Sequence, residues 1–275
     1  RAKRNPKKVV FAEAEHYKIL KAAQQVKDDG IAEPILLGRR RKILDLIEEF
    51  GIEFDNVCII DPKDPKQDTK RYKYGDVLWE KRKRKGMTQF EARKLMRERN
   101  YYGSMMVEMG DADALISGIS RNYRSTIKPA IEVIGKEDGV NKVIGMYIIR
   151  TKKGTLFLAD TTINMNPTAE EIAEISVLIA KSVKQFRIKP RLALLSYSNF
   201  GSTRTDDSAK MAKAAEIIRK DHPDLVVDGE IQADFALDTE KTERIFPFSP
   251  FAEESANTLI FPNLESGNIA YKLMR

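Results

Sequence analysis

Short apolar runs alternate with longer amphipathic segments through the first half of the chain. Residues 8–12 (KVVFA), 33–38 (EPILLG) and 57–61 (VCIID) have the length and content of buried strands. Between them, apolar side chains recur at helical spacing, first at residues 19, 22, 23 and 26 and then at 43, 46, 47 and 50. This order of strand and helix predicts a parallel sheet flanked by helices.

The middle of the chain has a polar connection followed by helical patterns. Residues 61–75 are polar and contain prolines, which predicts a loop. Two helices should follow, separated at Gly86, and Thr88 with Glu91 forms a capping box for the second. A methionine-rich helix over 101–109 and a strand over 114–117 come next. Methionines in such a pattern are typical of core packing rather than of a metal or cofactor site.

A change of composition near residues 134–142 indicates a domain boundary. Beyond it, residues 143–160 predict a hairpin that turns at 152–154, and Thr168 with Glu171 caps a helix with an apolar face. A strand should lead into the stretch that starts at Leu194, the segment DLVVDGEIQAD follows, a further strand is expected at 258–261, and a helix starts near the end. The first lobe should therefore end near residue 138.

The stretch LLSYSNFGSTRTDDSAK runs from a strand through a small polar turn into a helix. Unsatisfied backbone N–H groups at such a junction can bind an anion. An ordinary turn, with Asp207 capping the helix, explains the pattern equally well. Similar polar turns occur at 117–129, 159–168 and 261–268, and ligands lie beyond the carboxyl ends of parallel strands. The candidate ligand contacts are Ser196, Ser198, Asn199, Gly201, Ser202, Asn263, Ser266 and Asn268.

The residue types expected of metal or histidine chemistry are sparse. His16 and His222 both look like helix-end residues, and Asp61, Asp111 and Asp113 look like turn formers. We therefore predict no metal site in this chain.

Charge and composition narrow the class of protein. The 275 residues are 42% hydrophobic and carry a formal charge of +7, concentrated at 39–42 and 81–85. Basic runs of this kind are common on solvated faces, and no nucleic-acid-reading motif accompanies them, so we expect no nucleic-acid partner. No apolar run reaches eighteen residues, so we expect no membrane span. One cysteine, Cys58, in an apolar strand pattern predicts a packed thiol and a reducing cytoplasm.

Five segments, in order, resemble the phosphate acetyl/butyryl transferase family. They are RKRKGMT, YYGSMMVEMGDADALISG, LLSYSNFGS, VDGEIQADFAL and LIFPNLESGNIAYKLM. The resemblance implies two α/β domains of the isocitrate/isopropylmalate dehydrogenase type, with a cleft between them that binds coenzyme A and acetyl phosphate. One α/β lobe then covers 1–138, completed by 264–275 and by a segment beyond them, and the second covers 139–263. It places Arg82 and Lys128 at the phosphate, and the candidate polar turns at coenzyme A.

The details are similar to one branch of that family, the C-terminal domain of large bacterial NADP-dependent malic enzymes. Tyr123 stands where transacetylases usually have threonine, and Lys128 where they usually have arginine. Lysine keeps the charge but lacks the planar fork that grips phosphate in two places. The family's last catalytic element, a Ser-Arg pair and an aspartate, should follow residue 274. A start without Met, in RAKRNPKK, fits a piece of a longer chain.

The resemblance favours a domain that binds acetyl-CoA as a regulatory ligand of a malic enzyme. NADP and a divalent metal are then expected only on a malic domain of the same chain, and the domain should form a homo-oligomer, at least a dimer. An active phosphate acetyltransferase remains the alternative, in which cations would stabilise the oxyanion and the departing phosphate. A basic scaffold or nucleic-acid-binding module is a third hypothesis, of a different class.

Overall fold

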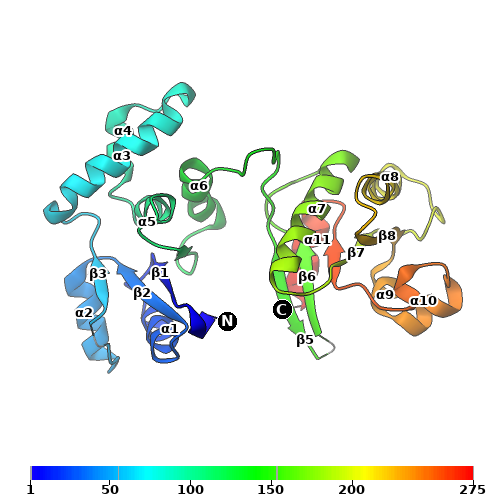
Figure 1. The fold of residues 1–275 in the computed structure, drawn as a ribbon, viewed down its shortest axis with the longest axis horizontal. Coiled ribbons are helices and arrows are strands. Elements are labelled where there is room, and N and C mark those ends of the chain that lie inside the picture. Colours follow the sequence, from blue (N-terminus) through cyan, green and yellow to red (C-terminus); the bar gives the residue numbers. More distant parts are fainter. Residues whose placement is uncertain (1, 55, 153, 275) are drawn as a thin grey trace. The chain divides into compact units, whose positions relative to one another are not determined.

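The structure is a computed structural model that describes residues 2–54, 56–152 and 154–274. Contacts within the chain divide it into two compact units, Arg1–Glu137 (unit 1) and Asp138–Arg275 (unit 2), shown in Figure 1. The division falls inside the segment whose composition indicates a domain boundary. Each unit has its own sheet and its own apolar core.

Unit 1 is built on a parallel sheet with the strand order β3-β2-β1-β4. Within the described ranges its strands are β1 (Lys7–Phe11), β2 (Ala32–Leu37), β3 (Cys58–Ile60) and β4 (Ala114–Ile116). Its helices are α1 (Tyr17–Asp28), α2 (Arg40–Glu49), α3 (Asp68–Arg82), α4 (Gln89–Leu95), α5 (Arg99–Glu108) and α6 (Tyr123–Val133), with short 3₁₀ turns at Ala2–Arg4, Pro65–Gln67 and Lys83–Lys85.

Alternation along the strands of unit 1 separates its core into two layers. Phe11 and Leu36 pack on one face with side chains of α1 and α2. Val10 and Leu37 point to the opposite face and pack with the buried side chains of α3, α4 and α5, which include Met96, Met105 and Met106. The period of two along a strand produces this division, because successive side chains point to opposite faces. The sheet is therefore covered by helices on both sides.

Unit 2 has a mixed sheet with the order β5-β6-β9-β7-β8, in which β5 is antiparallel to β6 and the other pairs are parallel. Its described strands are β5 (Tyr147–Thr151), β6 (Gly154–Ala159), β7 (Arg191–Leu195), β8 (Val226–Ile231) and β9 (Thr258–Ile260). Its helices are α7 (Ala169–Gln185), α8 (Asp206–Asp221), α9 (Ala233–Leu237), α10 (Thr239–Ile245) and α11 (Leu264–Met274), with a 3₁₀ turn at Pro250–Ala252.

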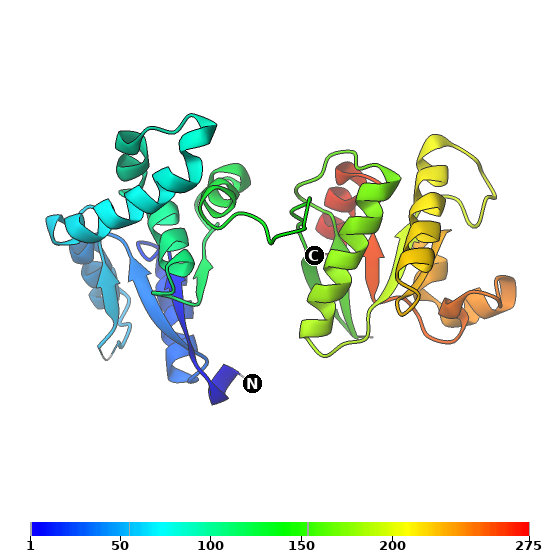
Figure 2. The ribbon, with the colours of Figure 1, turned by 45° about the horizontal axis from the view of Figure 1, so that its top comes forward.

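The helices of unit 2 also cover both faces of its sheet. Figure 2 shows α7 and α8 together, and the apolar face of α7 packs with strand residues such as Phe157 and Leu194. The other face, which includes Leu158 and Leu195, packs with α9, the 3₁₀ turn at 250–252 and Tyr271 of α11. Both sheets are thus mainly parallel and sandwiched by helices, which confirms the predicted α/β class. The two-domain dehydrogenase type stays a prediction.

The last helix corrects one expectation about the lobes. Residues 264–274 were expected to complete the first lobe, but α11 packs on unit 2. Its Tyr271 ring stacks on Tyr147 with centroids 4.0 Å apart. Gly267 lets α11 lie close to the backbone at the end of β6, since a Cβ at this position would be 2.7 Å from the carbonyl oxygen of Asp160. The helix therefore serves as a cover for the β5–β6 side of this sheet.

Most predicted elements are present, and their boundaries show where local patterns were misleading. The hairpin β5–β6 pairs Thr151 with Gly154, although its predicted turn residue Lys153 lies outside the described residues. The capping boxes at Thr88 and Thr168 are both confirmed. The predicted loop over 61–75 is wrong in its second half, because α3 begins at Asp68 and buries side chains at helical spacing.

The single cysteine is not packed as predicted. Cys58 is exposed at the start of β3, an edge strand of unit 1. The apolar pattern around it is that of a strand, but an edge strand has a neighbour on one side only and covers less of its own surface.

The contact between α3 and α4 yields a stability prediction. A Cβ at Gly75 would lie 2.6 Å from Cγ and 2.7 Å from Cα of Arg93 in α4. We expect Gly75→Ala to lower the free energy of unfolding of unit 1 by about 1–3 kcal/mol, because backbone atoms must move apart. Urea unfolding monitored by the chain's one tryptophan, Trp79 in α3, measures this change. The control Lys73→Ala, at an exposed position of α3, should stay within about 0.5 kcal/mol. Equal stability of the two variants would show that α4 can move without cost.

Candidate functional site

Arg82 and Lys128, the two cations predicted to bind phosphate, line one pocket of unit 1. Arg82 is the last residue of α3, and Lys128 lies in the middle of α6. The sequence predicts a polar turn over 117–129, but α6 occupies most of this range, because Pro129 inside the helix conceals the helical pattern. The pocket has a volume of about 510 Å³, and its lining also includes Lys85, Gly86, Met87, Glu91, Lys94, Leu95, Glu98, Tyr101 and Glu132.

A carboxylate that the sequence analysis missed lies between the two cations. Glu132, one turn after Lys128 in α6, places Oε1 3.5 Å from Nη2 of Arg82 and 3.9 Å from Nζ of Lys128. The hydroxyl of Tyr101 donates a hydrogen bond to its other oxygen. Burial, together with the hydrogen bond to Glu132, raises the pKa of Tyr101 well above its usual range, so this hydroxyl keeps its proton. The Glu132 carboxylate is only 14% exposed.

This arrangement determines what the pocket can do chemically. Arg82 and Lys128 can attract a phosphate group, but Glu132 already offsets part of their charge. Nε of Arg82 is buried and has no hydrogen-bond partner among the described residues, so one donor of the guanidinium remains unused. The cations of the lining are accompanied by the apolar side chains of Met87 and Leu95. A ligand with phosphate groups and an uncharged arm fits this mixture of surfaces.

The turn after β7, predicted to hold an external anion, holds an internal one. The carboxylate of Glu230, at 3% exposure, accepts hydrogen bonds from the hydroxyl of Ser198 at 3.0 Å and from the backbone N–H of Gly201 at 2.6 Å. Ser198 is itself fully buried, and its hydroxyl oxygen accepts from the N–H of Thr203. The glycine and serines of this turn are therefore accounted for by a carboxylate of the neighbouring strand β8.

The remaining predicted contacts of this turn also have local partners. Ser196 accepts from the N–H of Ser198, Ser202 accepts from the N–H of Asn199, and the Asn199 side chain accepts from the N–H of Gln232. The cap of α8 is Thr205, in a capping box with Ser208, rather than Asp207. Asp207 lies within the helix's first turn, where its charge suits the helix dipole but its side chain is two positions too late to cap.

The predicted contacts at 263–268 form the start of α11. The side chain of Asn263 accepts a hydrogen bond from the N–H of Ser266, and the Ser266 hydroxyl donates back to the carbonyl of Asn263. Asn268 donates its amide to the carbonyl of Thr161, in the turn after β6. Strands β6, β9 and β7 are adjacent and parallel, so the turns that carry all eight predicted contacts emerge at one edge of the sheet.

Two more polar turns enclose carboxylates of the chain. Asp160 accepts backbone hydrogen bonds from Gly145, Thr162, Ile163 and Asn164. In unit 1, Glu13 accepts from the backbone N–H groups of residues 118, 119 and 120 in the turn after β4, and from the Ser120 hydroxyl.

Hydrogen bonding dominates the acidity of Glu13. Burial by itself would raise the pKa of this carboxyl, but the Ser120 hydroxyl and the three backbone donors lower the pKa to about 2. The carboxylate thus stays ionised and holds the turn that leads into α6, the helix of Lys128 and Glu132.

Other predicted residues have structural roles. His16 caps the start of α1, and His222 ends α8. Asp61 accepts from the N–H of Lys63, as expected of a turn former. Asp113 instead accepts from the N–H of Lys8 in β1, and Asp111 pairs with Tyr74 and Lys70. Across the described ranges, no three His, Cys, Asp or Glu side chains are grouped to hold a metal ion. The helices of those ranges are also too short or too polar to cross a bilayer.

Comparison with known proteins identifies the family. The model of the family described as phosphate acetyl/butaryl transferase matches residues 1–275. The chain belongs to this family. A phosphate acetyltransferase of Clostridium acetobutylicum is 33% identical to this chain over 281 residues, which cover 100% of this chain and 83% of the relative. An NADP-dependent malic enzyme of Escherichia coli is 37% identical over 275 residues, which cover 100% of this chain and 36% of the relative.

Solved structures of the family agree with this result. The EutD phosphotransacetylase from Staphylococcus aureus has a TM-score of 0.85 at 30% identity, over 98% of this chain and 81% of that one. This phosphate acetyl/butyryl transferase family chain thus has relatives of two kinds, free transferases and a region of malic enzymes. It spans about a third of the length of the malic enzymes that it matches.

The turn that encloses Glu13 should contribute to stability in a pH-dependent way. A carboxylate with a lowered folded-state pKa stabilises the fold above its unfolded pKa of 4.5, and this contribution disappears as the pH falls towards about 2. We expect Glu13→Gln to cost about 2–3 kcal/mol at pH 7, the cost of losing hydrogen bonds to a buried charged group. The difference from the unmodified protein should shrink between about pH 5 and pH 2. Urea unfolding monitored by Trp79 measures both values, with the exposed Glu33→Gln as control. A difference that does not change with pH would contradict this role.

The closed turn after β7 leads to a second prediction, which separates a structural from a ligand-binding role. We expect Ser198→Ala to lower stability by about 1–3 kcal/mol, because Glu230 loses a donor and the N–H of Thr203 loses an acceptor in a buried site. Hydrogen exchange of residues 198–203 should become faster. Ser202→Ala, at an exposed position of the same turn, should have a smaller effect. If Ser198→Ala leaves stability and exchange unchanged and only weakens coenzyme A binding, the turn is a ligand site.

Proposed function

We propose that this chain is the phosphotransacetylase-like part of a malic enzyme and binds acetyl-CoA as a regulatory ligand. The observation that carries the proposal is the position of Glu132 between Arg82 and Lys128. A transferase must stabilise the charge of a departing phosphate, and a carboxylate beside these cations opposes that charge. Binding without transfer tolerates such a neighbour, because only overall affinity is reduced.

The pocket of Arg82 supports acetyl-CoA as the ligand. Phosphate groups of the coenzyme would pair with Arg82 and Lys128, with Lys85 and Lys94 nearby, and the uncharged arm would contact Met87 and Leu95. The contacts predicted in unit 2 stay candidate contacts of coenzyme A in their own right, through donors and acceptors left over from their local bonds. They are Ser196, Ser198, Asn199, Gly201, Ser202, Asn263, Ser266 and Asn268.

The similarity to malic enzymes supports placing this chain in the malic enzyme branch of the family. Malate oxidation, NADP and a divalent metal would belong to a region of the full-length protein outside these 275 residues. Regulation requires that acetyl-CoA bind one state of the whole protein better than another. A homo-oligomer of at least two copies and a cytoplasmic location remain predictions that accompany this proposal.

An active phosphate acetyltransferase is the second candidate. It is favoured by the placement of Arg82 and Lys128 in one pocket, and by the free phosphate acetyltransferase that this chain covers over most of its length. Transfer also needs a base for the thiol, which the resemblance assigns to an aspartate of the family's last catalytic element.

The primary experiment is an assay of malate-dependent NADP reduction by the full-length protein across acetyl-CoA concentrations. We expect a saturable change of rate. Arg82→Ala should raise the half-effective concentration by about tenfold or more, the loss of one charge-assisted interaction. Lys220→Ala, at an exposed position of α8, is the control and should have no effect. A rate that does not respond to acetyl-CoA contradicts the proposal. Acetyl-CoA formation from acetyl phosphate that disappears in Arg82→Ala establishes the second candidate instead.

Glu132 provides a sharper test of the same pocket. Because its carboxylate repels phosphate, Glu132→Gln should lower the half-effective acetyl-CoA concentration about twofold to fivefold, equivalent to about 0.5–1 kcal/mol. Tyr101→Phe keeps that charge and should leave the concentration within about twofold. Weaker binding in Glu132→Gln would show that the carboxylate orders the pocket rather than opposing the ligand.

A further inference from the structure

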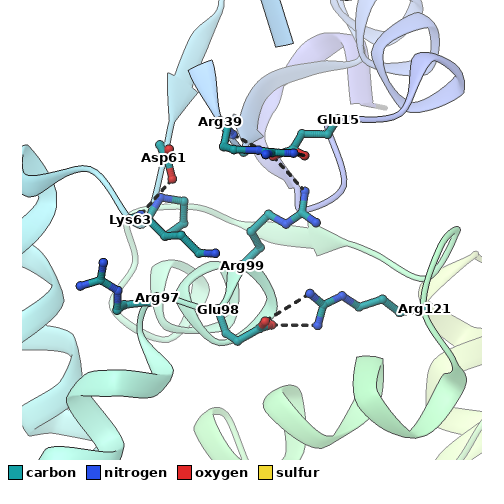
Figure 3. Close-up of a pocket in the computed structure, with 10 residues that line it drawn as sticks. Glu15, Arg39, Asp61, Lys63, Arg97, Glu98, Arg99 and Arg121 are labelled. Carbon is teal, nitrogen blue, oxygen red and sulfur yellow. Dashed lines mark hydrogen bonds and ion pairs between the residues drawn. The ribbon is translucent and has the colours of Figure 1, made fainter. Parts of the chain in front are cut away.

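A second pocket of unit 1 has no role in the proposed function. It lies where strands β2 and β3 end and where helices α2 and α5 begin, as Figure 3 shows. Its volume is about 310 Å³. The lining consists of Glu15, Gly38, Arg39, Asp61, Pro62, Lys63, Arg97, Glu98, Arg99 and Arg121. Such a position beyond the carboxyl ends of parallel strands is where α/β sheets bind ligands.

Cations outnumber carboxylates in this lining. Arginines 39, 97, 99 and 121 together with Lys63 contribute five positive charges, against three negative ones from Glu15, Asp61 and Glu98, which leaves an excess of two. Lys63 and Arg97 are both exposed and form no ion pair with a carboxylate of the described residues. The pocket therefore has two uncommitted cations at its rim.

The carboxylates of the pocket are already satisfied by the chain. Oε2 of Glu15 lies 2.9 Å from Nη2 of Arg39 and 3.3 Å from Nζ of Lys42, and its Oε1 lies 3.7 Å from Nη1 of Arg99. Burial opposes this ionisation, but the hydrogen bonds from Arg39 lower the pKa of Glu15 to about 2. Glu98 is held by both terminal nitrogens of Arg121. Both carboxylates are thus occupied by cations of the chain, and the excess positive charge lies on the other side chains of the lining.

Unused donors point to the kind of ligand. Nη1 of Arg99 is buried and lacks a hydrogen-bond partner among the described residues, since its 3.7 Å distance to Glu15 is too long for a hydrogen bond. Helices α2 and α5 both begin at this pocket, and neither has a side-chain cap in the structure. Helix N-termini carry partial positive charge and free N–H groups, which favour phosphate.

We propose that this pocket binds the phosphate group of a small phosphorylated molecule. A phosphate monoester carries about −1.5 to −2 charges at neutral pH, which matches the excess of the lining. The volume lies at the lower end of the range of about 300–1,000 Å³ for small-molecule sites, so the ligand is a compact ester rather than a nucleotide coenzyme. The inference goes beyond the proposed function, because it concerns a different pocket and a different ligand.

Isothermal titration calorimetry of the full-length protein tests the site, with glycerol 3-phosphate as the probe and glycerol as the uncharged comparison. We expect saturable binding of the ester and none of glycerol. Lys63→Ala and Arg97→Ala should each weaken binding by about tenfold or more, the effect of one lost charge-assisted contact. Arg41→Ala, an exposed arginine of α2 outside the lining, should stay within about twofold. Circular dichroism shows whether every variant is folded.

Two further measurements separate this site from the pocket of Arg82 and from general attraction of anions. Binding of the ester should persist in Arg82→Ala, whereas the response to acetyl-CoA should not. Affinity should fall as the pH decreases through about 6, where the ester loses its second charge, while sulfate binding should not fall. The proposal is overturned if glycerol 3-phosphate does not bind, if Lys63→Ala and Arg97→Ala bind it as the unmodified protein does, or if Arg82→Ala alone removes it.

Discussion

The structure depends on buried carboxylates that accept hydrogen bonds from polar turns at the carboxyl ends of its strands. Glu13 in unit 1, and Asp160 and Glu230 in unit 2, each accept several backbone or hydroxyl hydrogen bonds from such a turn. A turn rich in N–H groups would otherwise have unsatisfied donors or require an external anion. An acid from a neighbouring segment fixes the backbone before any ligand arrives. The turns at the carboxyl ends of these strands are therefore preorganised by the chain's own carboxylates.

Glu132 extends the same principle to the cations. By lying between Arg82 and Lys128, it keeps two charged side chains in place that would otherwise repel each other. The cost is weaker attraction for phosphate, because any ligand competes with an internal anion.

The sequence predicts the α/β class and most elements, because strand alternation and helical periodicity are local properties. Capping boxes at Thr88 and Thr168 and the apolar face of α7 were predictable for that reason. The pairing of polar turns with carboxylates was not, since Glu13 lies more than a hundred residues before its donors and Glu230 about thirty after. The family resemblance identified Arg82 and Lys128, but only folding reveals Glu132 between them. Pro129 obscured the helical pattern of α6 in the sequence. Cys58 is exposed because β3 is an edge strand.

A side chain shared by the two pockets of unit 1 can couple binding in one pocket to binding in the other. Glu98 forms part of the wall of both pockets of unit 1, and its carboxylate is held by Arg121 on one side. An occupant that draws Arg121 away changes the field that Glu98 exerts on the neighbouring cavity. Linkage is reciprocal. If a ligand in one pocket changes the binding free energy of a ligand in the other, the second ligand changes the binding free energy of the first by the same amount. A single shared side chain can thus make two occupancies interdependent without any rearrangement of the backbone.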